Sequence, residues 1–190
     1  MAVVGLSSLV ACTADRDATS QGLPGVTTAA DPDAFVPGTL DATAQPYVDG
    51  LATNFVEGGR LSARLDPDPA ACVAERWIAI LEPARLEAGG LAGAAMADVT
   101  LDRLRQAVDI DAPRAAAVLD AFPACEADYE TAFLDSLVVV GQITLGQQVC
   151  LADALPDEVL VAITRNVLSG EDPDATAATQ FGTALDQCAG

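Results

Sequence analysis

Apolar side chains in residues 45–190 recur every three or four positions, which is the spacing of one face of an α-helix. No run alternates with a period of two for long enough to propose a strand, and glycines and prolines separate the runs. Alanine-rich composition with only 4% aromatic residues also favours closely packed helices. The sequence therefore predicts an all-α fold of about seven or eight short helices. The stripes comprise Tyr47, Leu51 and Phe55; Val73, Trp77, Ile80 and Leu81; Leu101, Leu104 and Val108; Ala115, Val118, Leu119, Phe122 and Cys125; Tyr129, Phe133, Leu137 and Val140; Leu160, Ile163 and Val167; and Ala178, Phe181, Leu185 and Cys188.

Two stretches of this region resemble each other weakly. Residues 47–75 read YVDGLATNFVEGGRLSARLDPDPAACVAE, and residues 129–153 read YETAFLDSLVVVGQITLGQQVCLAD. When four residues are omitted from the second stretch, Tyr47 is matched with Tyr129 and Cys72 with Cys150. The match predicts two related helical half-units packed on a common core, and chance similarity between alanine-rich helices is the alternative.

The first twelve residues contain a short apolar run that ends in a cysteine. A run of about ten residues is too short to span a bilayer, which needs about 20, but it fits the apolar part of a secretory signal. Leu9-Val10-Ala11-Cys12 resembles the lipobox of bacterial lipoproteins, in which the cysteine is acylated and becomes the first residue of the mature chain. The resemblance implies a signal peptide over 1–11, lipidation of Cys12, and an extracytoplasmic location anchored to the cell membrane.

The segment departs from the lipoprotein pattern because no Lys or Arg precedes the apolar run, so we expect the natural start to lie upstream of Met1. The alternative is a buried N-terminal helix in which Cys12 packs as a core residue. Residues 13–44 are rich in Thr, Ala, Asp, Pro and Gly and lack an apolar period. We therefore expect residues 12–44 to be the lipidated cysteine and a disordered tether, and residues 45–190 to be the folded helical domain.

Four further cysteines belong to the predicted domain, and an oxidising compartment favours disulfides between them. Cys72 and Cys150 lie near the starts of their expected helices, whereas Cys125 and Cys188 end the stripes of later helices. When two helices pack antiparallel, the start of one meets the end of the other. This geometry predicts the bridges Cys72–Cys125 and Cys150–Cys188, one in each half-unit. Four reduced, buried cysteines in a cytosolic protein are the alternative.

The charge of the chain is strongly one-sided, with 28 acidic residues, nine Arg, and a net charge of −19. Nucleic acid is not expected as a partner, because phosphate contacts need a basic surface. The same charge repels an anionic membrane, so the lipid on Cys12 would have to hold the protein there. An acidic surface can attract cations or a basic partner, and the alternative is that it only keeps an alanine-rich domain soluble.

The absence of His and Lys limits the chemistry that this chain can perform. It cannot build a Ser-His-Asp triad, a zinc-protease site, a Schiff base or a Walker A loop. Asp-Pro-Asp triplets occur at 31–33, 66–68 and 172–174, but the last is not followed by the Gly and acidic residue of an EF-hand loop. We expect Asp68 and Asp172 to cap helices ahead of proline instead, and we predict no metal or cofactor site.

Three classes of function remain, and we expect the first of them: a lipid-anchored extracytoplasmic binding or interaction module. No motif identifies its partner, which could be a protein or another envelope ligand. An enzyme is less expected, although a carboxylate pair could hydrolyse an envelope glycan, with Trp77 stacked on the sugar if it is not in the core. The third class is a small-ligand carrier with a cavity between helices. An exposed apolar patch would favour the interaction module, a cleft with two carboxyl groups the hydrolase, and an enclosed apolar pocket the carrier.

Overall fold

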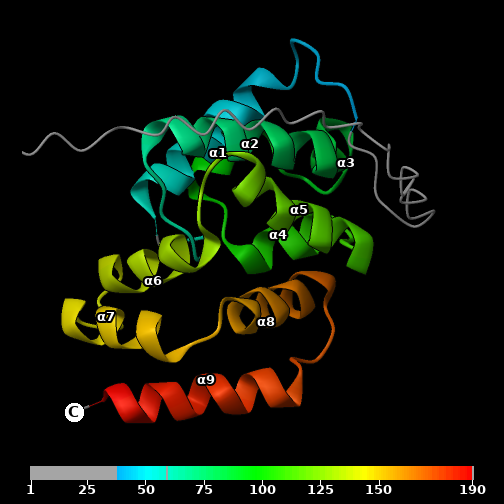
Figure 1. The fold of residues 1–190 in the computed structure, drawn as a ribbon. Coiled ribbons are helices and arrows are strands. Elements are labelled where there is room, and N and C mark those ends of the chain that lie inside the picture. The colour runs from blue at the N-terminus through cyan, green and yellow to red at the C-terminus, as the bar shows by residue number, and fades with distance from the viewer. Residues whose placement is uncertain (1–37, 59, 190) are drawn as a thin grey trace, which may run out of the picture. The chain divides into compact units, whose positions relative to one another are not determined.

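The computed structural model describes residues 38–58 and 60–189, and within these residues helices are the only regular secondary structure (Figure 1). The all-α prediction is therefore confirmed for this part of the chain. The lipobox, the expected signal peptide, the Asp-Pro-Asp triplet at 31–33 and most of the expected tether lie outside it. The helices are α1 (Gln45–Glu57), α2 (Pro67–Leu81), α3 (Pro83–Ala88), the 3₁₀ helix η1 (Gly93–Asp98), α4 (Leu101–Ala107), α5 (Ala112–Ala124), α6 (Tyr129–Val139), α7 (Leu145–Ala154), α8 (Asp157–Ser169) and α9 (Ala175–Cys188).

Besides α7, whose helix only the repeat predicts, two elements have no counterpart among the predicted stripes, α3 and η1. Each spans six residues, which is too short to display a helical period. Side-chain contacts hold η1 in place: Asn54 of α1 is buried, and its Nδ2 donates to the carbonyl oxygens of Met96 at 3.0 Å and Val99 at 2.9 Å. A Cβ on Gly50 would lie only 2.7 Å from the Gly93 carbonyl oxygen, so glycine is what allows α1 and η1 to approach this closely.

Five of the ten described helices, α4, α5, α6, α7 and α9, begin at a side chain that accepts a hydrogen bond from the first turn, as N-cap residues do. Asp111 and Asp128 cap α5 and α6 in this way. The expected caps Asp68 and Asp172 are wrong by two residues. Asp66 occupies the N-cap position of α2, because Pro67 is the first helical residue, and its side chain makes no capping bond. Asp174 caps α9 by accepting from the backbone N–H of Ala177 at 2.8 Å, because Pro173 precedes the helix.

Aromatic rings connect the first helices. Phe55 of α1 and Trp77 of α2 make an edge-on contact with ring centroids 5.1 Å apart, and Phe122 of α5 lies 6.1 and 6.2 Å from them. The indole Nε1–H of Trp77 donates to the carbonyl oxygen of Val118 at 2.8 Å, which satisfies the only polar atom of this side chain. Trp77 is therefore a core residue and is not available to stack on a sugar.

The described helices form one stack, and each of its two halves, α1 to α5 and α6 to α9, contains one disulfide. The helices stack in the order α1, α2, α5, α8 and α9, and α7 lies against α6 and α9 (Figure 1). Disulfides join Cys72 to Cys125, and thus α2 to the end of α5, and join Cys150 to Cys188, and thus α7 to the end of α9. These are the pairs that the repeat predicts. They close loops of 53 and 38 residues, and each stabilises the fold by about 4 kcal/mol in the chain-entropy model.

The second half departs from the predicted stripe. On α6, Phe133 and Leu137 are only half-buried and Val140 is 47% exposed, whereas Leu134 and Ser136 are fully buried. The reason is that α6 packs on α5, α7 and α8, so a single helical face cannot describe its contacts. On α9, likewise, the buried alanines are Ala177 and Ala184, and the predicted Ala178 is exposed.

Residues 38–44, which the sequence assigns to the tether, pack on the helical domain. The backbone N–H of Gly38 donates to the carbonyl oxygen of Ala79 at 3.0 Å, and Leu40 packs against the core. Ala44 is 1% exposed at the N-terminus of α1. Too few residues are involved to produce a periodic pattern, so the sequence gives no sign of these contacts.

Tyr129 lies where the two halves meet. Its ring contacts Phe122 at a centroid distance of 4.9 Å, and its hydroxyl is hydrogen-bonded to the Thr164 hydroxyl of α8 at 2.8 Å. Burial raises the pKa of Tyr129 above its ordinary value, and the hydrogen bond from Thr164 opposes this only in part.

A chain that begins at Gln45 should fold but should be less stable than one that begins at Gly38. The shorter chain loses the Gly38–Ala79 hydrogen bond and the packing of Leu40 and Ala44, a cost of about 1 to 3 kcal/mol. The melting temperature should fall by roughly 2 to 10 °C, as measured by circular dichroism. Equal melting temperatures would show that these contacts contribute nothing.

The stability of the protein should fall at alkaline pH because of Tyr129. An unfolded tyrosine ionises near pH 10, whereas the folded pKa of Tyr129 is higher. Its contribution is therefore complete below about pH 10 and is lost as the pH rises further. The chain contains no Lys to titrate in the same range. Denaturant unfolding between about pH 8 and about pH 11 should show a shallower decline for Tyr129→Phe than for the wild type. Burial also raises the pKa of Tyr47 above its ordinary value, so Tyr47→Phe is measured in parallel to separate the two contributions. It should retain the decline that Tyr129 causes, and an unchanged slope in Tyr129→Phe would contradict the assignment.

Candidate functional site

The longest stretch without a charged residue in this acidic chain is the 17-residue segment 136–152, which reads SLVVVGQITLGQQVCLA. It comprises the end of α6, the turn that follows, and most of α7. Asp135 and Asp153 flank it immediately on either side. A chain of net charge −19 therefore presents one uncharged hairpin, which is where a partner meets the least electrostatic repulsion.

Large apolar side chains are exposed on this hairpin. We call them the α6–α7 patch: Val139 and Val140, each 47% exposed, Leu145, 69% exposed, and Val149, 66% exposed. Among the described residues, the other large apolar side chain with comparable exposure is Val56 of α1, at 38%. Single exposed apolar residues are ordinary on protein surfaces, but several gathered on one short hairpin are typical of a contact surface.

The turn of the hairpin has a defined geometry. The backbone N–H of Gly141 donates to the Val138 carbonyl oxygen at 3.0 Å, and that of Gln142 donates to the Leu137 carbonyl oxygen at 2.9 Å. This pair of bonds is a Schellman motif, which requires a left-handed residue after the helix. Gly141 has a φ of 71°, a conformation that glycine adopts without strain. The motif ends α6 directly after the two exposed valines.

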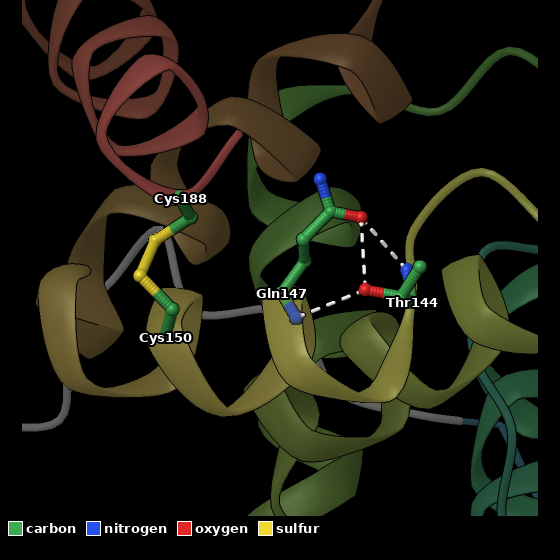
Figure 2. Close-up of a disulfide and its surroundings, with 4 residues drawn as sticks. All are labelled: Thr144, Gln147, Cys150 and Cys188. Atoms are coloured by element: carbon green, nitrogen blue, oxygen red, sulfur yellow. Dashed lines mark hydrogen bonds between the residues drawn. A yellow bond between two sulfur atoms is a disulfide. The ribbon is translucent and has the colours of Figure 1, made fainter. Parts of the chain in front are cut away.

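A capping box begins α7 (Figure 2). The hydroxyl of Thr144 accepts from the backbone N–H of Gln147 at 3.2 Å, and the Gln147 side-chain oxygen accepts from the Thr144 N–H at 2.9 Å. Leu145 is therefore the first helical residue, and Val149, four positions later, projects from the same face. The capping box thus sets the direction in which both patch side chains point.

The middle of α7 is also held. Cys150 is joined to Cys188 at the end of α9 (Figure 2), with 5.8 Å between their Cα atoms. The adjacent Leu151 is fully buried. The side-chain nitrogen of Gln148 donates to the Asp135 carboxylate, which ties α7 back to α6. The patch is therefore carried by a helix that is held at its start and at its middle, and little ordering entropy would be lost on binding.

The hollows found on the described surface do not resemble an enclosed ligand cavity. Those of 250 to 320 Å³, and a larger one of 670 Å³ beside α1 and α2, are all open to solvent. An enclosed apolar pocket, which a small-ligand carrier needs, is not among them.

One hollow of 250 Å³ gathers carboxylates, as the hydrolase alternative requires. It is lined by Asp66, Glu126, Asp128 and Asp135, beside Arg64. Two of these carboxylates have structural partners: Asp128 accepts from the Thr131 N–H at 2.7 Å, and Asp135 accepts from Gln148. Within the described residues no group of His, Cys, Asp or Glu is arranged to hold a metal ion.

Of the five cysteines that the sequence marks as candidate sites, four lie in the described part of the chain. Cys12 lies outside the described part of the chain, and the four other cysteines form the two disulfides. In the described region, the helices are too short or too polar to cross a bilayer. The apolar periodicity does not predict the patch: Val140 belongs to a stripe that is expected to be buried, and Leu145 and Val149 belong to none of the predicted stripes. The charge-free segment 136–152 was the signal that could have found it.

Comparison with known proteins gives no relative: no family model, no curated protein and no solved structure matches this chain.

The α6–α7 patch should be dispensable for folding. Because Leu145 and Val149 are mostly exposed, the double variant Leu145→Gln/Val149→Gln should change the free energy of unfolding by less than about 1 kcal/mol. It should also elute earlier from a hydrophobic-interaction column. The adjacent Leu151→Ala, by contrast, should lose about 2 to 5 kcal/mol because Leu151 is buried. A large loss of stability in the double variant would mean that these side chains support the fold and are not a contact surface.

Proposed function

We propose that this chain is a lipid-anchored extracytoplasmic interaction module that presents the α6–α7 patch to a protein partner. The observation that carries the proposal is the exposure of Val139, Val140, Leu145 and Val149 on an uncharged hairpin whose second helix is held by a capping box at its start and by a disulfide at its middle. Covering such side chains gains about 1 to 2 kcal/mol each at most, which is enough for a specific contact when the surface is already rigid.

The partner that suits this surface has an apolar centre and a basic margin. The patch is bordered in sequence by Asp135 and Asp153, and the chain as a whole carries −19. Arg or Lys side chains around an apolar contact would be attracted to such a surface and would select against acidic competitors. Raising the salt concentration should accordingly weaken the complex.

The location is supported by two independent features. Leu9-Val10-Ala11-Cys12 resembles a lipobox, and the domain contains two disulfides, which persist in oxidising compartments. A lipid on Cys12 would hold an acidic domain near a membrane that its charge alone would not approach.

Lipidation can be tested on protein expressed from its native locus and extracted from the membrane. Its intact mass should show a chain that begins at Cys12 and carries an acyl adduct. Cys12→Ala should release or mislocalise the protein, whereas Ala11→Gly, a small-for-small control, should leave it anchored. Recovery of full-length protein with unmodified Cys12 from the membrane would contradict this part of the proposal.

The role of the patch can be tested with a photo-crosslinking amino acid placed at position 145 or 149 in cells. The same protein should be captured from both positions, and capture should be lost when Val140→Glu is added. The control probe at position 186, an exposed site on α9, should capture nothing in common with them. The affinity of the purified pair should also fall as salt is raised. Adducts with lipid alone, with a second copy of the chain, or equally from position 186 would contradict the proposal.

A further inference from the structure

A second surface feature lies on the first half of the domain, away from the residues of the α6–α7 patch. It is an open groove of 670 Å³ between α1, α2 and residues 40–44. The lining from α1 is Gln45, Val48, Asp49 and Ala52, whose spacing of three and four places them on one helical face. The groove therefore follows the axis of α1 over about two turns.

Small and apolar side chains form the floor of the groove. Leu40, Val48 and Ala52 are half-buried and pack against the core. Ala71 of α2 lines the groove as well and is exposed. Because alanine fills little space, the room between α1 and α2 is left to solvent, and an apolar segment of a ligand could occupy it.

Carboxylates border this floor on every contributing segment. Asp41 precedes α1, Asp49 belongs to α1 and Glu75 to α2, and all three are exposed. No basic side chain lines the groove, and the ion pairs found among the described residues involve other carboxylates: Asp98, Glu82 and Asp111. Hydrogen bonds from the Thr43 hydroxyl and N–H lower the pKa of Asp41 below its ordinary value.

From this arrangement we infer that the groove binds a basic amphipathic peptide segment of a partner protein, with small apolar side chains on the floor and Lys or Arg at the carboxylates.

Charge decides among the occupants. Residues 1–37 of the chain itself contain four Asp and a single Arg, and a second copy carries −19, so neither is complementary. A metal ion is disfavoured because the described carboxylates form no metal-binding group. The inference rests on α1 and α2 and does not depend on the function proposed for α6 and α7.

The test uses the full chain and a fluorescent helical peptide built from Lys-Ala-Leu-Ala repeats, with binding followed by anisotropy. The peptide should bind, and binding should weaken as salt is raised. A peptide with Glu in place of Lys should not bind, and one with Ser in place of Leu should bind more weakly, because attraction and apolar contact are both required.

Two variants locate the site. Asp49→Asn/Glu75→Gln should weaken binding about fivefold or more, because two exposed ion pairs are removed. Asp120→Asn/Asp186→Asn is the matched control, since it changes the net charge equally at exposed positions on α5 and α9, and it should change affinity less than twofold. Ala71→Arg places a long cationic side chain in the groove from an exposed helical position and should abolish binding while leaving the thermal melt unchanged.

The inference is overturned if the two charge variants weaken binding equally, since the peptide would then respond to net charge alone. It is also overturned if Ala71→Arg binds the peptide as well as the wild type. Self-association of the protein without peptide that is lost in Ala71→Arg would assign the groove to a second copy instead.

Discussion

Phe122 of α5 is the side chain on which the two halves of the domain depend. It is fully buried, and its ring contacts Phe55 and Trp77 on one side and Tyr129 on the other. From Tyr129 the ring contacts continue to Phe133 and then to Phe181 of α9. A chain with only 4% aromatic residues thus uses nearly all of those in its described part to build one connected path from α1 to α9. Each edge-on pair contributes about 0.5 to 1.5 kcal/mol beyond its burial, so this path helps to hold α1, α2, α5, α6 and α9 together.

Covalent and non-covalent connections are divided between different parts of the fold. Each disulfide lies within one half, from Cys72 to Cys125 or from Cys150 to Cys188, whereas the halves meet through the packing of α5 on α8, the Phe122–Tyr129 ring contact and a hydrogen bond from the Arg64 N–H to the Ala132 carbonyl oxygen. Alanine-rich helices bury little apolar area per residue, so bridges worth about 4 kcal/mol each are a large share of the stability of such a domain.

Sequence periodicity predicts the parts of this fold in which one face of a helix is buried. The stripes on α1, α2 and α5 are confirmed. The match of Cys72 with Cys150 also predicts both disulfides, because it places these two cysteines at equivalent positions in the order of helices. The errors occur where burial depends on neighbours distant in sequence. Leu134 is buried only because α6 has three helical neighbours, and η1 exists only because Asn54 reaches Met96 and Val99. The exposure of Leu145 and Val149 is of the same kind: their spacing suits a core face, and only the placement of α6 and α9 leaves that face uncovered. The groove could not be predicted either, because its walls come from three separate segments.

The strong negative charge gives the two surfaces different selectivities. Two copies of an acidic chain repel each other over about a Debye length, so the α6–α7 patches of two copies, with Leu145 and Val149, are kept from contacting each other. A basic partner experiences the opposite force and approaches with an increased rate. At the groove, Asp49 and Glu75 lie beside the apolar floor itself, so charge acts directly on the bound segment. At the α6–α7 patch the nearest charges flank an uncharged hairpin and act at a distance. At the patch, salt should therefore affect mainly the rate of association. At the groove it should also affect the lifetime of the complex, because only there would charges be in contact after binding.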